Sequence, residues 1–69
     1  MYTIAAPAGQ PIGPVSKILG ELLHYIRKKH KLTQKDLAEM LGVSPAYISN
    51  AENGKLPYKK IIDIIKALV

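Results

Sequence analysis

Apolar residues recur at helical spacing through most of this chain. In residues 15–30 they fall three or four positions apart, at Leu19, Leu22, Leu23 and Ile26. An apolar side chain returning to the same face at every turn is typical of an amphipathic helix. We therefore expect a first helix here, with these four side chains as its buried stripe.

A second, shorter helix is predicted over residues 33–41. Thr33 is a favourable N-cap residue, and Asp36, three positions later, completes an approximate capping box. Gly42 supplies the left-handed conformation that commonly ends a helix. The inward side chains of this helix are expected to be Leu37, Ala38 and Leu41.

A third helix is predicted directly afterwards, over residues 45–52. Ser44 caps it, and Pro45 occupies the first helical position, where a missing N–H costs nothing. The pair Asn53-Gly54 ends it with a second left-handed residue. The inward residues of this helix are expected to be Ile48 and Ala51.

The last predicted helix covers about residues 57–68 and carries more apolar side chains than one contact with a core requires. These side chains spread over more than one face and belong to Ile61, Ile62, Ile64, Ile65, Leu68 and Val69. The surplus can be covered by the N-terminal arm, by a second subunit or by residues outside this sequence.

Residues 1–14 form an arm rich in alanine, proline and glycine, and residues 15–69 form the folded domain. A stable helix is not expected in the arm, although Tyr2–Ile4 can form a short strand. We expect its apolar residues to pack on the helices or on a second subunit, and disorder is the alternative. The apolar residues of the arm and its junction are Tyr2, Ile4, Ile12 and Val15.

The charge of the chain favours a nucleic-acid partner. Ten Lys and Arg against five Asp and Glu give a net charge of +5, and the pI is near 9.6. Such values are typical of nucleic-acid-binding domains, and lysines that only solubilise a small protein are the alternative. The sequence has no cysteine, which excludes disulfides and suits a reducing cytoplasm. We also expect neither a membrane-spanning helix nor a signal peptide.

The turn between the second and third predicted helices brings these observations together. Two helices joined by a three-residue turn that contains glycine form the unit that lays its second helix in the major groove of DNA. The chain resembles the Cro- and repressor-type (XRE) helix-turn-helix family at Leu32-Thr33-Gln34, Leu37-Ala38, Leu41-Gly42-Val43-Ser44, Tyr47-Ile48-Ser49 and Glu52-Asn53-Gly54-Lys55. The resemblance covers about residues 15–68. It implies an all-α, lambda-repressor-like bundle of four helices, or of five.

Base readout is expected from the exposed half of the third helix. The candidate base contacts are Pro45, Ala46, Tyr47, Ser49 and Asn50. The amide of Asn50 can pair bidentately with the N6/N7 edge of adenine, and Ala46 suits a thymine methyl group. Because no Arg or Lys lies between Ser44 and Asn53, we expect the contacted bases to be rich in A·T. A solvated surface asparagine is the alternative for Asn50.

The resemblance also implies phosphate contacts on both sides of the groove. The candidate phosphate contacts are Gln34, Asn53, Lys55, Tyr58 and Lys59. Arg27 resembles the family position whose guanidinium pairs with the glutamate of the Glu-Asn-Gly signature, here Glu52. That pair is expected to be structural. Gly20, inside the first helix, costs up to about 1 kcal/mol against alanine and is tolerable if it permits close helix contact.

Enzymatic chemistry is not expected. His24 and His30 lack carboxylate or cysteine companions at metal-ligand spacing, so no metal site is predicted. Ser44 and Ser49 lack a convincing base, and no glycine-rich phosphate loop is present. We therefore predict no catalytic residue and no cofactor.

The predicted partner is double-stranded DNA, bound by a homodimer that reads half-sites about 34 Å apart. The predicted role is a transcriptional regulator at the cytoplasmic nucleoid, a repressor rather than an activator. The alternative is an antitoxin or adaptor that holds a protein partner with its last helix and arm. A basic amphipathic membrane-surface protein is disfavoured, because the cations flank caps and turns instead of following one long helix.

Overall fold

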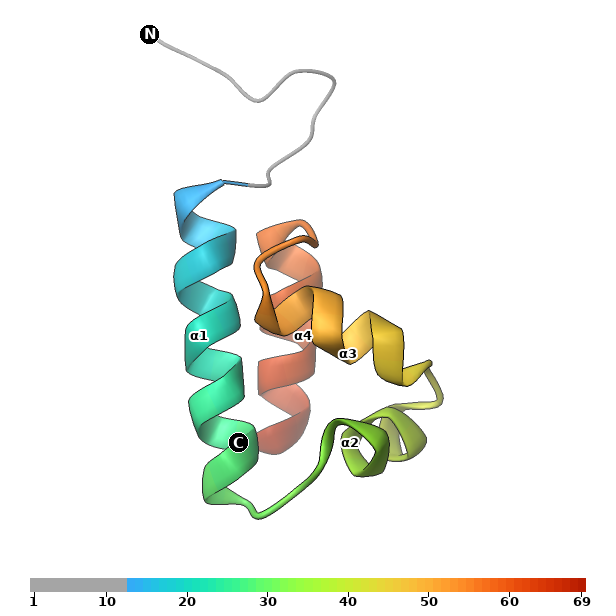
Figure 1. Ribbon diagram of the computed structural model, residues 1–69. Helices are drawn as coiled ribbons and strands as arrows, with labels where there is room; N and C mark the ends of the chain where they lie inside the picture. The colour runs from blue at the N-terminus through green and yellow to red at the C-terminus, as the bar shows by residue number, and fades with distance from the viewer. Residues whose placement is uncertain (1–12) are drawn as a thin grey trace, which may run out of the picture.

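The computed structural model describes residues 13–69, which form four helices joined by short turns (Figure 1). The helices are α1 (Pro14–Lys29), α2 (Gln34–Leu41), α3 (Pro45–Glu52) and α4 (Tyr58–Leu68). No strand occurs in this part of the chain, so the predicted all-α fold with four helices is confirmed. The predictions for Tyr2, Ile4 and Ile12 lie outside the described residues.

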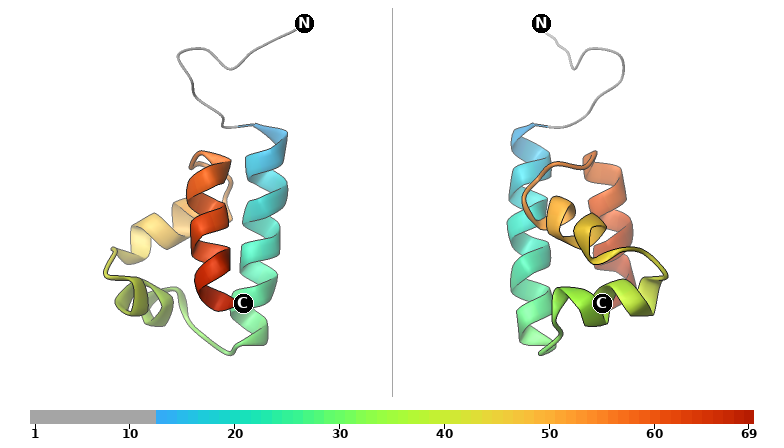
Figure 2. Two further views of the ribbon diagram at one scale, coloured as in Figure 1. Left: turned by 180° about the vertical axis from the view of Figure 1, so that it is seen from behind. Right: turned by 45° about the vertical axis from the view of Figure 1, so that its right-hand side comes forward.

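Two helices form the back of the molecule and two project from it. α1 and α4 lie side by side and run in the same direction, as both views of Figure 2 show. α3 crosses this pair and contacts both helices, and α2 packs on α3 at the far side (Figure 1). No helix of the described residues is long and apolar enough to cross a membrane.

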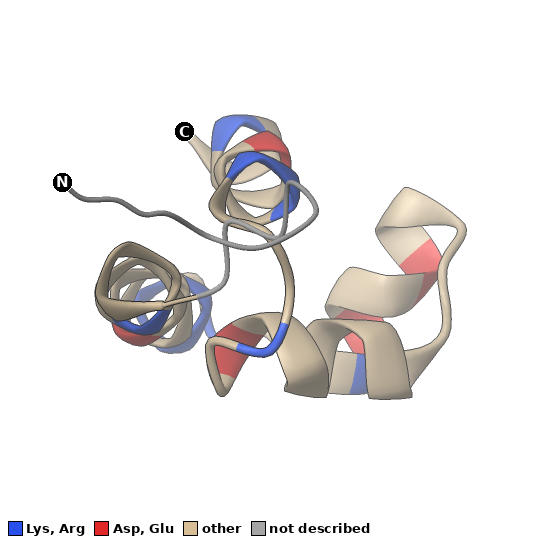
Figure 3. Ribbon diagram, turned by 90° about the horizontal axis from the view of Figure 1, so that it is seen from above, with Lys and Arg blue, Asp and Glu red and all other residues tan. Residues whose placement is uncertain are grey.

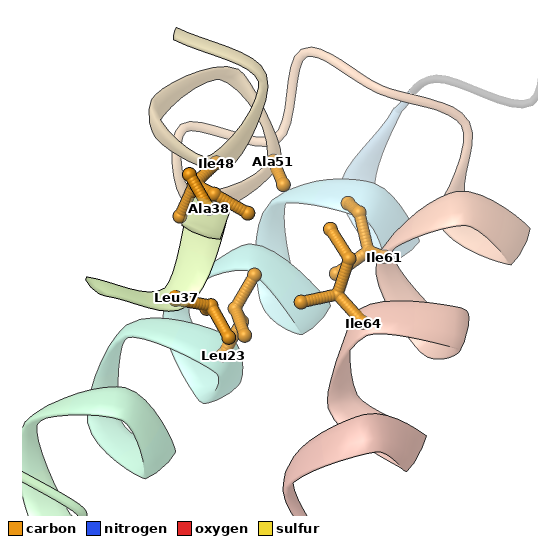
Figure 4. Close-up of a cluster of buried hydrophobic side chains, with 7 residues drawn as sticks. All are labelled: Leu23, Leu37, Ala38, Ile48, Ala51, Ile61 and Ile64. Carbon is orange, nitrogen blue, oxygen red and sulfur yellow. The ribbon is translucent and has the colours of Figure 1, made fainter. Parts of the chain in front are cut away.

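All four helices contribute to one small core (Figure 4). Its buried apolar residues are Leu23 from α1, Leu37 and Ala38 from α2, Ile48 and Ala51 from α3, and Ile61 and Ile64 from α4. Half-buried apolar side chains that pack against this core are Leu19, Leu41, Val43, Tyr47, Leu56, Ile65 and Leu68. The inward residues predicted for the second and third helices therefore lie in or against the core.

The predicted helix ends are confirmed. Thr33 Oγ1 accepts from Asp36 N at 2.9 Å while Thr33 N donates to Asp36 Oδ2 at 3.0 Å, which is a complete capping box. Ser44 Oγ accepts from Tyr47 N at 3.1 Å. Gly42 and Gly54 have φ of 71° and 72°, the left-handed conformation that glycine adopts without strain. These four residues fix where α2 and α3 begin and end.

α1 is also followed by a residue in the left-handed conformation, but this residue is a lysine and not a glycine. Lys31 has a φ of 59°. Its N–H donates to the carbonyl of Lys28 at 2.9 Å, and Leu32 N donates to that of Arg27 at 3.2 Å. These two bonds form a Schellman motif, which is usually built around glycine. No pattern in the sequence indicated a left-handed residue at this lysine.

The predicted buried stripe of α1 is wrong at one position, because Leu22 is 44% exposed. Leu19 and Ile26 are half-buried, and the buried residues of α1 are Ser16, Gly20, Leu23 and Arg27. The inner face holds small residues because α3 comes very close. A Cβ added at Gly20 would lie 2.6 Å from the carbonyl oxygen of Ala51. The close helix contact that makes a glycine tolerable at position 20 is therefore present.

Candidate nucleic-acid interface

α3 has one buried and one exposed face. Ile48 and Ala51 are fully buried, which orients the helix on the core. The residues on the opposite side that are exposed to solvent are Pro45, Ala46, Asn50 and Asn53. Ser49 is half-buried, and Tyr47 is half-buried and packs against the core. The structure therefore presents Pro45, Ala46 and Asn50 most openly among the predicted base contacts.

The turn before α3 holds this face in place. Gly42 lets Val43 N reach back to the carbonyl of Ala38 at 3.0 Å, and the side chain of Val43 packs against the core. Ser44 then caps α3 and Pro45 is its first residue. Because both ends of the turn are tied to the core or to a helix, α2 and α3 form one rigid unit.

The other end of α3 is tied to α1 by the carboxylate of Glu52. Arg27 Nε donates to Glu52 Oε2, and Arg27 Nη2 donates to Oε1 at 3.1 Å. The remaining end of the guanidinium, Nη1, donates to the carbonyl of Leu32 at 2.6 Å. Only 7% of the Arg27 side chain and 5% of the Glu52 side chain are exposed. This bidentate pair joins α1, α3 and the turn after α1.

Two further side chains donate to the same carboxylate. His24 Nδ1 lies 3.0 Å from Glu52 Oε1, and Gln34 Nε2 donates to that oxygen at 3.2 Å. Arg27 Nη2 also lies 3.3 Å from His24 Nδ1. A carboxylate only accepts and a guanidinium only donates, so a proton on His24 Nδ1 makes the bond to Glu52, whereas a bare Nδ1 accepts from Arg27. The network therefore connects α1, α2 and α3 at one carboxylate.

The pKa of Glu52 reflects a balance between burial and these donors. Burial raises the pKa, but hydrogen bonds from Arg27, His24 and Gln34, together with the charge of Arg27, outweigh burial and leave the pKa of Glu52 below its ordinary value of 4.5. The pKa of Asp36 is also lowered, because it accepts hydrogen bonds from the backbone and side chain of Thr33. Glu52 is thus an anion at neutral pH and strengthens the pair with Arg27.

The contacts of His24 and Gln34 with Glu52 were missed in the sequence. His24 was considered only as a metal ligand, although it lies one helical turn before Arg27 and so on the same side of α1. Gln34 was assigned to DNA phosphates alone. One of its two amide N–H groups is free of Glu52, because a primary amide has two donors and one bond to Glu52 is present.

The other predicted phosphate contacts lie around the start of α4. Asn53, Lys55 and Lys59 are exposed, whereas Tyr58 is half-buried. α4 has no side-chain cap at Pro57, which is the N-cap residue rather than the first helical residue as predicted. Figure 3 shows Lys and Arg on α1, on α4 and in the turn between α3 and α4. α3 itself has none.

The described residues offer no evident metal site, since no group of three or more His, Cys, Asp and Glu in this part of the chain is placed to hold an ion. What the arrangement provides is a rigid, uncharged helix face with cations on neighbouring elements. The predicted base contacts belong to this face and the predicted phosphate contacts to its surroundings, which is the division expected of a protein that reads DNA sequence.

A family model described as helix-turn-helix matches residues 23–68, which includes all of α2, α3 and α4. The chain belongs to the XRE-type helix-turn-helix family of DNA-binding domains. The predicted resemblance is therefore confirmed, and the α2–α3 unit is the helix-turn-helix of this domain.

The domain is also similar to a curated phage protein. The ImmF control region 10 kDa protein of Bacillus phage phi105 is 41% identical over 54 residues, which are 77% of this chain and 60% of the phage protein. The chain thus matches less than two thirds of the length of that relative. No solved structure gives a significant match.

Proposed function

We propose that this helix-turn-helix domain is a sequence-specific transcriptional regulator that inserts α3 in the major groove of DNA. The observation that carries the proposal is the exposed side of α3, with Ala46 and Asn50 open to solvent while Glu52 is bonded to α1 and α2. A recognition helix has to keep its orientation when it meets the groove, and this carboxylate network provides that rigidity.

Asn50 is the main base-reading residue in this proposal. Its amide can donate to and accept from the same adenine, a pair worth about 1–3 kcal/mol of discrimination against the wrong base. Pro45 and Ala46 offer only apolar surface and suit a thymine methyl group. Ser49 makes a hydroxyl contact at the edge of the helix in this proposal, and Tyr47 makes a contact with its ring edge or hydroxyl. Since α3 has no Lys or Arg, the preferred site is rich in A·T.

Phosphate contacts position the domain without reading sequence. Gln34 reaches one strand with its free amide N–H, and Asn53, Lys55 and Lys59 reach the other. The uncapped start of α4 adds backbone N–H groups, since the first N–H groups of a helix have no partner within it. Tyr58 adds its hydroxyl there. These contacts provide affinity that depends on salt.

A homodimer in the cytoplasmic nucleoid, bound to half-sites about 34 Å apart, is the proposed active form. The control-region name of the phage relative supports a regulatory role. Repression needs only that the bound protein occupy a promoter. A small domain can do this without a separate activating surface.

A selection of bound duplexes from random DNA tests the proposal, with wild type compared with Asn50→Ala and Asn53→Ala. Both variants shorten an exposed asparagine on or beside α3. We expect Asn50→Ala to lose preference at one A·T position, and Asn53→Ala to keep the wild-type motif with lower affinity for every duplex. An unchanged motif for Asn50→Ala would show that another residue reads the site.

A salt titration tests whether binding depends on phosphate contacts. For wild type, the logarithm of the affinity is expected to fall linearly with the logarithm of salt concentration, and Lys55→Ala is expected to reduce the slope by about 1. Glu39→Ala removes an exposed charge of α2 and serves as the control. Binding that is indifferent to salt would contradict the proposed phosphate contacts.

A further inference from the structure

The outer side of α1 carries an apolar stripe that no other part of the described structure covers. We define the outer stripe as Val15, Ile18, Leu22 and Tyr25, which are 53%, 64%, 44% and 61% exposed. Their spacing of three, four and three residues is the a/d pattern with which helices pack against each other in a coiled coil. Contiguous exposed apolar patches of this kind mark interaction sites.

The outer stripe lies away from the recognition surface. Gly20 and Arg27, which contact α3, occupy the opposite side of α1. A molecule bound to the outer stripe therefore leaves the exposed residues of α3 free. The family match begins at residue 23 and so includes only Tyr25 of these four residues, and no predicted DNA contact uses any of them.

The charges beside the outer stripe favour a second copy of the same chain. Glu21 and Lys28 are exposed and lie seven residues apart, which places them on the same flank of α1. In an antiparallel pair of helices this flank faces the same flank of the other helix. Glu21 of each copy then meets Lys28 of the other, so a two-fold axis creates two opposite-charge contacts.

We propose that two copies of this chain associate through Ile18, Leu22 and Tyr25 of their outer stripes, with the two α1 helices antiparallel. In this register Leu22 of each copy lies against Tyr25 of the other. Ile18 lies against the aliphatic stem of Lys29, whose ammonium is 5.8 Å from the ring centre of Tyr25 within one chain. The arm of residues 1–12 is a poorer occupant, because it has no charged side chain to meet Glu21 or Lys28.

This inference names the interface of the proposed homodimer but does not depend on DNA binding. One helix stripe is smaller than a standard interface of about 800 Å² per partner, so the dimer is weak. Its formation can be measured without DNA. Loss of DNA binding with intact dimerisation would contradict the proposed function alone.

Sedimentation equilibrium of the full chain, from about 1 μM to about 1 mM, measures the association directly. We expect the mass to rise with concentration from 7.6 kDa towards twice that value. Leu22→Lys should weaken association at least about tenfold. Met40→Lys, at an apolar residue of α2 that is 60% exposed, should leave it unchanged. Circular dichroism shows that each variant is folded.

A charge exchange tests the antiparallel arrangement. Glu21→Lys and Lys28→Glu should each weaken association about fivefold, because each creates two like-charge contacts, and the double exchange should restore it. Glu39→Lys, with the same change of charge on α2, should have no effect. Failure of the double exchange to restore association would overturn the antiparallel pair.

Three other outcomes would also overturn the proposal. A chain that stays monomeric throughout this concentration range has no self-association to assign to the outer stripe. A monomer in which Leu22→Lys lowers the melting temperature would show that the chain itself covers the outer stripe. A dimer that Leu22→Lys leaves intact would place the interface elsewhere.

Discussion

The two sides of α1 reverse the usual distribution of apolar side chains. The inner side holds Ser16, Gly20, Leu23 and Arg27, of which only Leu23 is a large apolar residue. The outer stripe holds Val15, Ile18, Leu22 and Tyr25 and is largely exposed. Which residues of α1 are buried depends on the neighbouring helices that pack against it. The hydrophobicity of each α1 residue does not predict whether that residue is buried.

The inner side has this composition because of the end of α3. The carbonyl oxygens of Ala51 and Glu52 approach α1 where only a glycine leaves room, at Gly20. The side chain of Glu52 also turns to α1, where its buried carboxylate needs a cation, which Arg27 supplies. Close backbone contact and a buried ion pair therefore replace the apolar packing expected on the inner side of a helix.

Arg27→Ala should be the most damaging change to the inner side. It leaves the nearly buried Glu52 carboxylate without its bidentate partner and frees the carbonyl of Leu32. Removing one partner of a buried pair costs about 3–5 kcal/mol. Chemical denaturation measures this loss. Lys28→Ala, at the exposed neighbour, should change the free energy of unfolding by less than about 0.5 kcal/mol. Similar losses for the two variants would show that the pair adds little.

Two adjacent leucines test the comparison directly. Leu23 is 0% exposed and Leu22 is 44% exposed. Leu23→Ala should cost about 2–5 kcal/mol, because it removes core packing and leaves a cavity. Leu22→Ala should cost less than about 0.5 kcal/mol in the monomer, measured by denaturation at low protein concentration. A larger cost at Leu22 than at Leu23 would mean that α1 packs on the core through its outer stripe.

Gly20→Ala tests the close approach of α1 and α3. The new Cβ would lie 2.6 Å from the carbonyl oxygen of Ala51 and 2.7 Å from that of Glu52, and neither backbone group can move freely. We expect a loss of about 1–3 kcal/mol, although alanine favours a helix over glycine by about 1 kcal/mol. Thermal melting at a protein concentration at which the chain is monomeric, compared with Glu21→Ala, an exposed neighbour, measures it. A gain in stability would mean that the two helices are further apart.

Most of the fold was predictable because its signals are local. The capping box of Thr33, the cap of Ser44, and the glycines at 42 and 54 each act within a few residues, and all four are as predicted. The face of α1 was not predictable from apolar spacing, because it depends on backbone atoms of α3 that are distant in the sequence.

In the candidate site, too, the features that depend on local sequence were predictable and those that depend on distant residues were not. The exposure of Ala46 and Asn50 follows from the period of α3 and the burial of Ile48 and Ala51. The bonds of His24 and Gln34 to Glu52 depend on how three helices meet. The base and phosphate contacts of the site stay predictions, which the binding-site selection and the salt titration test.

Acidification should weaken the inner side less than removal of Arg27. The folded-state pKa of Glu52 lies below its ordinary value of 4.5, so its ionisation stabilises the fold above pH 4.5. That contribution is lost as pH falls below 4.5 and through the lowered pKa. Glu52→Gln should be less stable at pH 7, and its difference from wild type should shrink with acid. Since Asp36 titrates in both proteins, comparing their melts at each pH isolates Glu52. A constant difference would contradict this reasoning.

Lys31→Gly should give the smallest effect, and it should be a gain. Lys31 closes α1 at a φ of 59°, and the bonds around it place the Leu32 carbonyl that Arg27 Nη1 contacts. A side chain with a Cβ is strained there by about 1–2 kcal/mol, whereas glycine is not but loses more freedom on folding. We expect a net gain of about 0.5–1 kcal/mol by denaturation. Lys31→Ala removes the same charge but keeps the Cβ, so it should give no gain. Equal gains for both variants would show that the effect comes from removing one positive charge among the cations at the end of α1. The backbone strain at Lys31 would then be negligible.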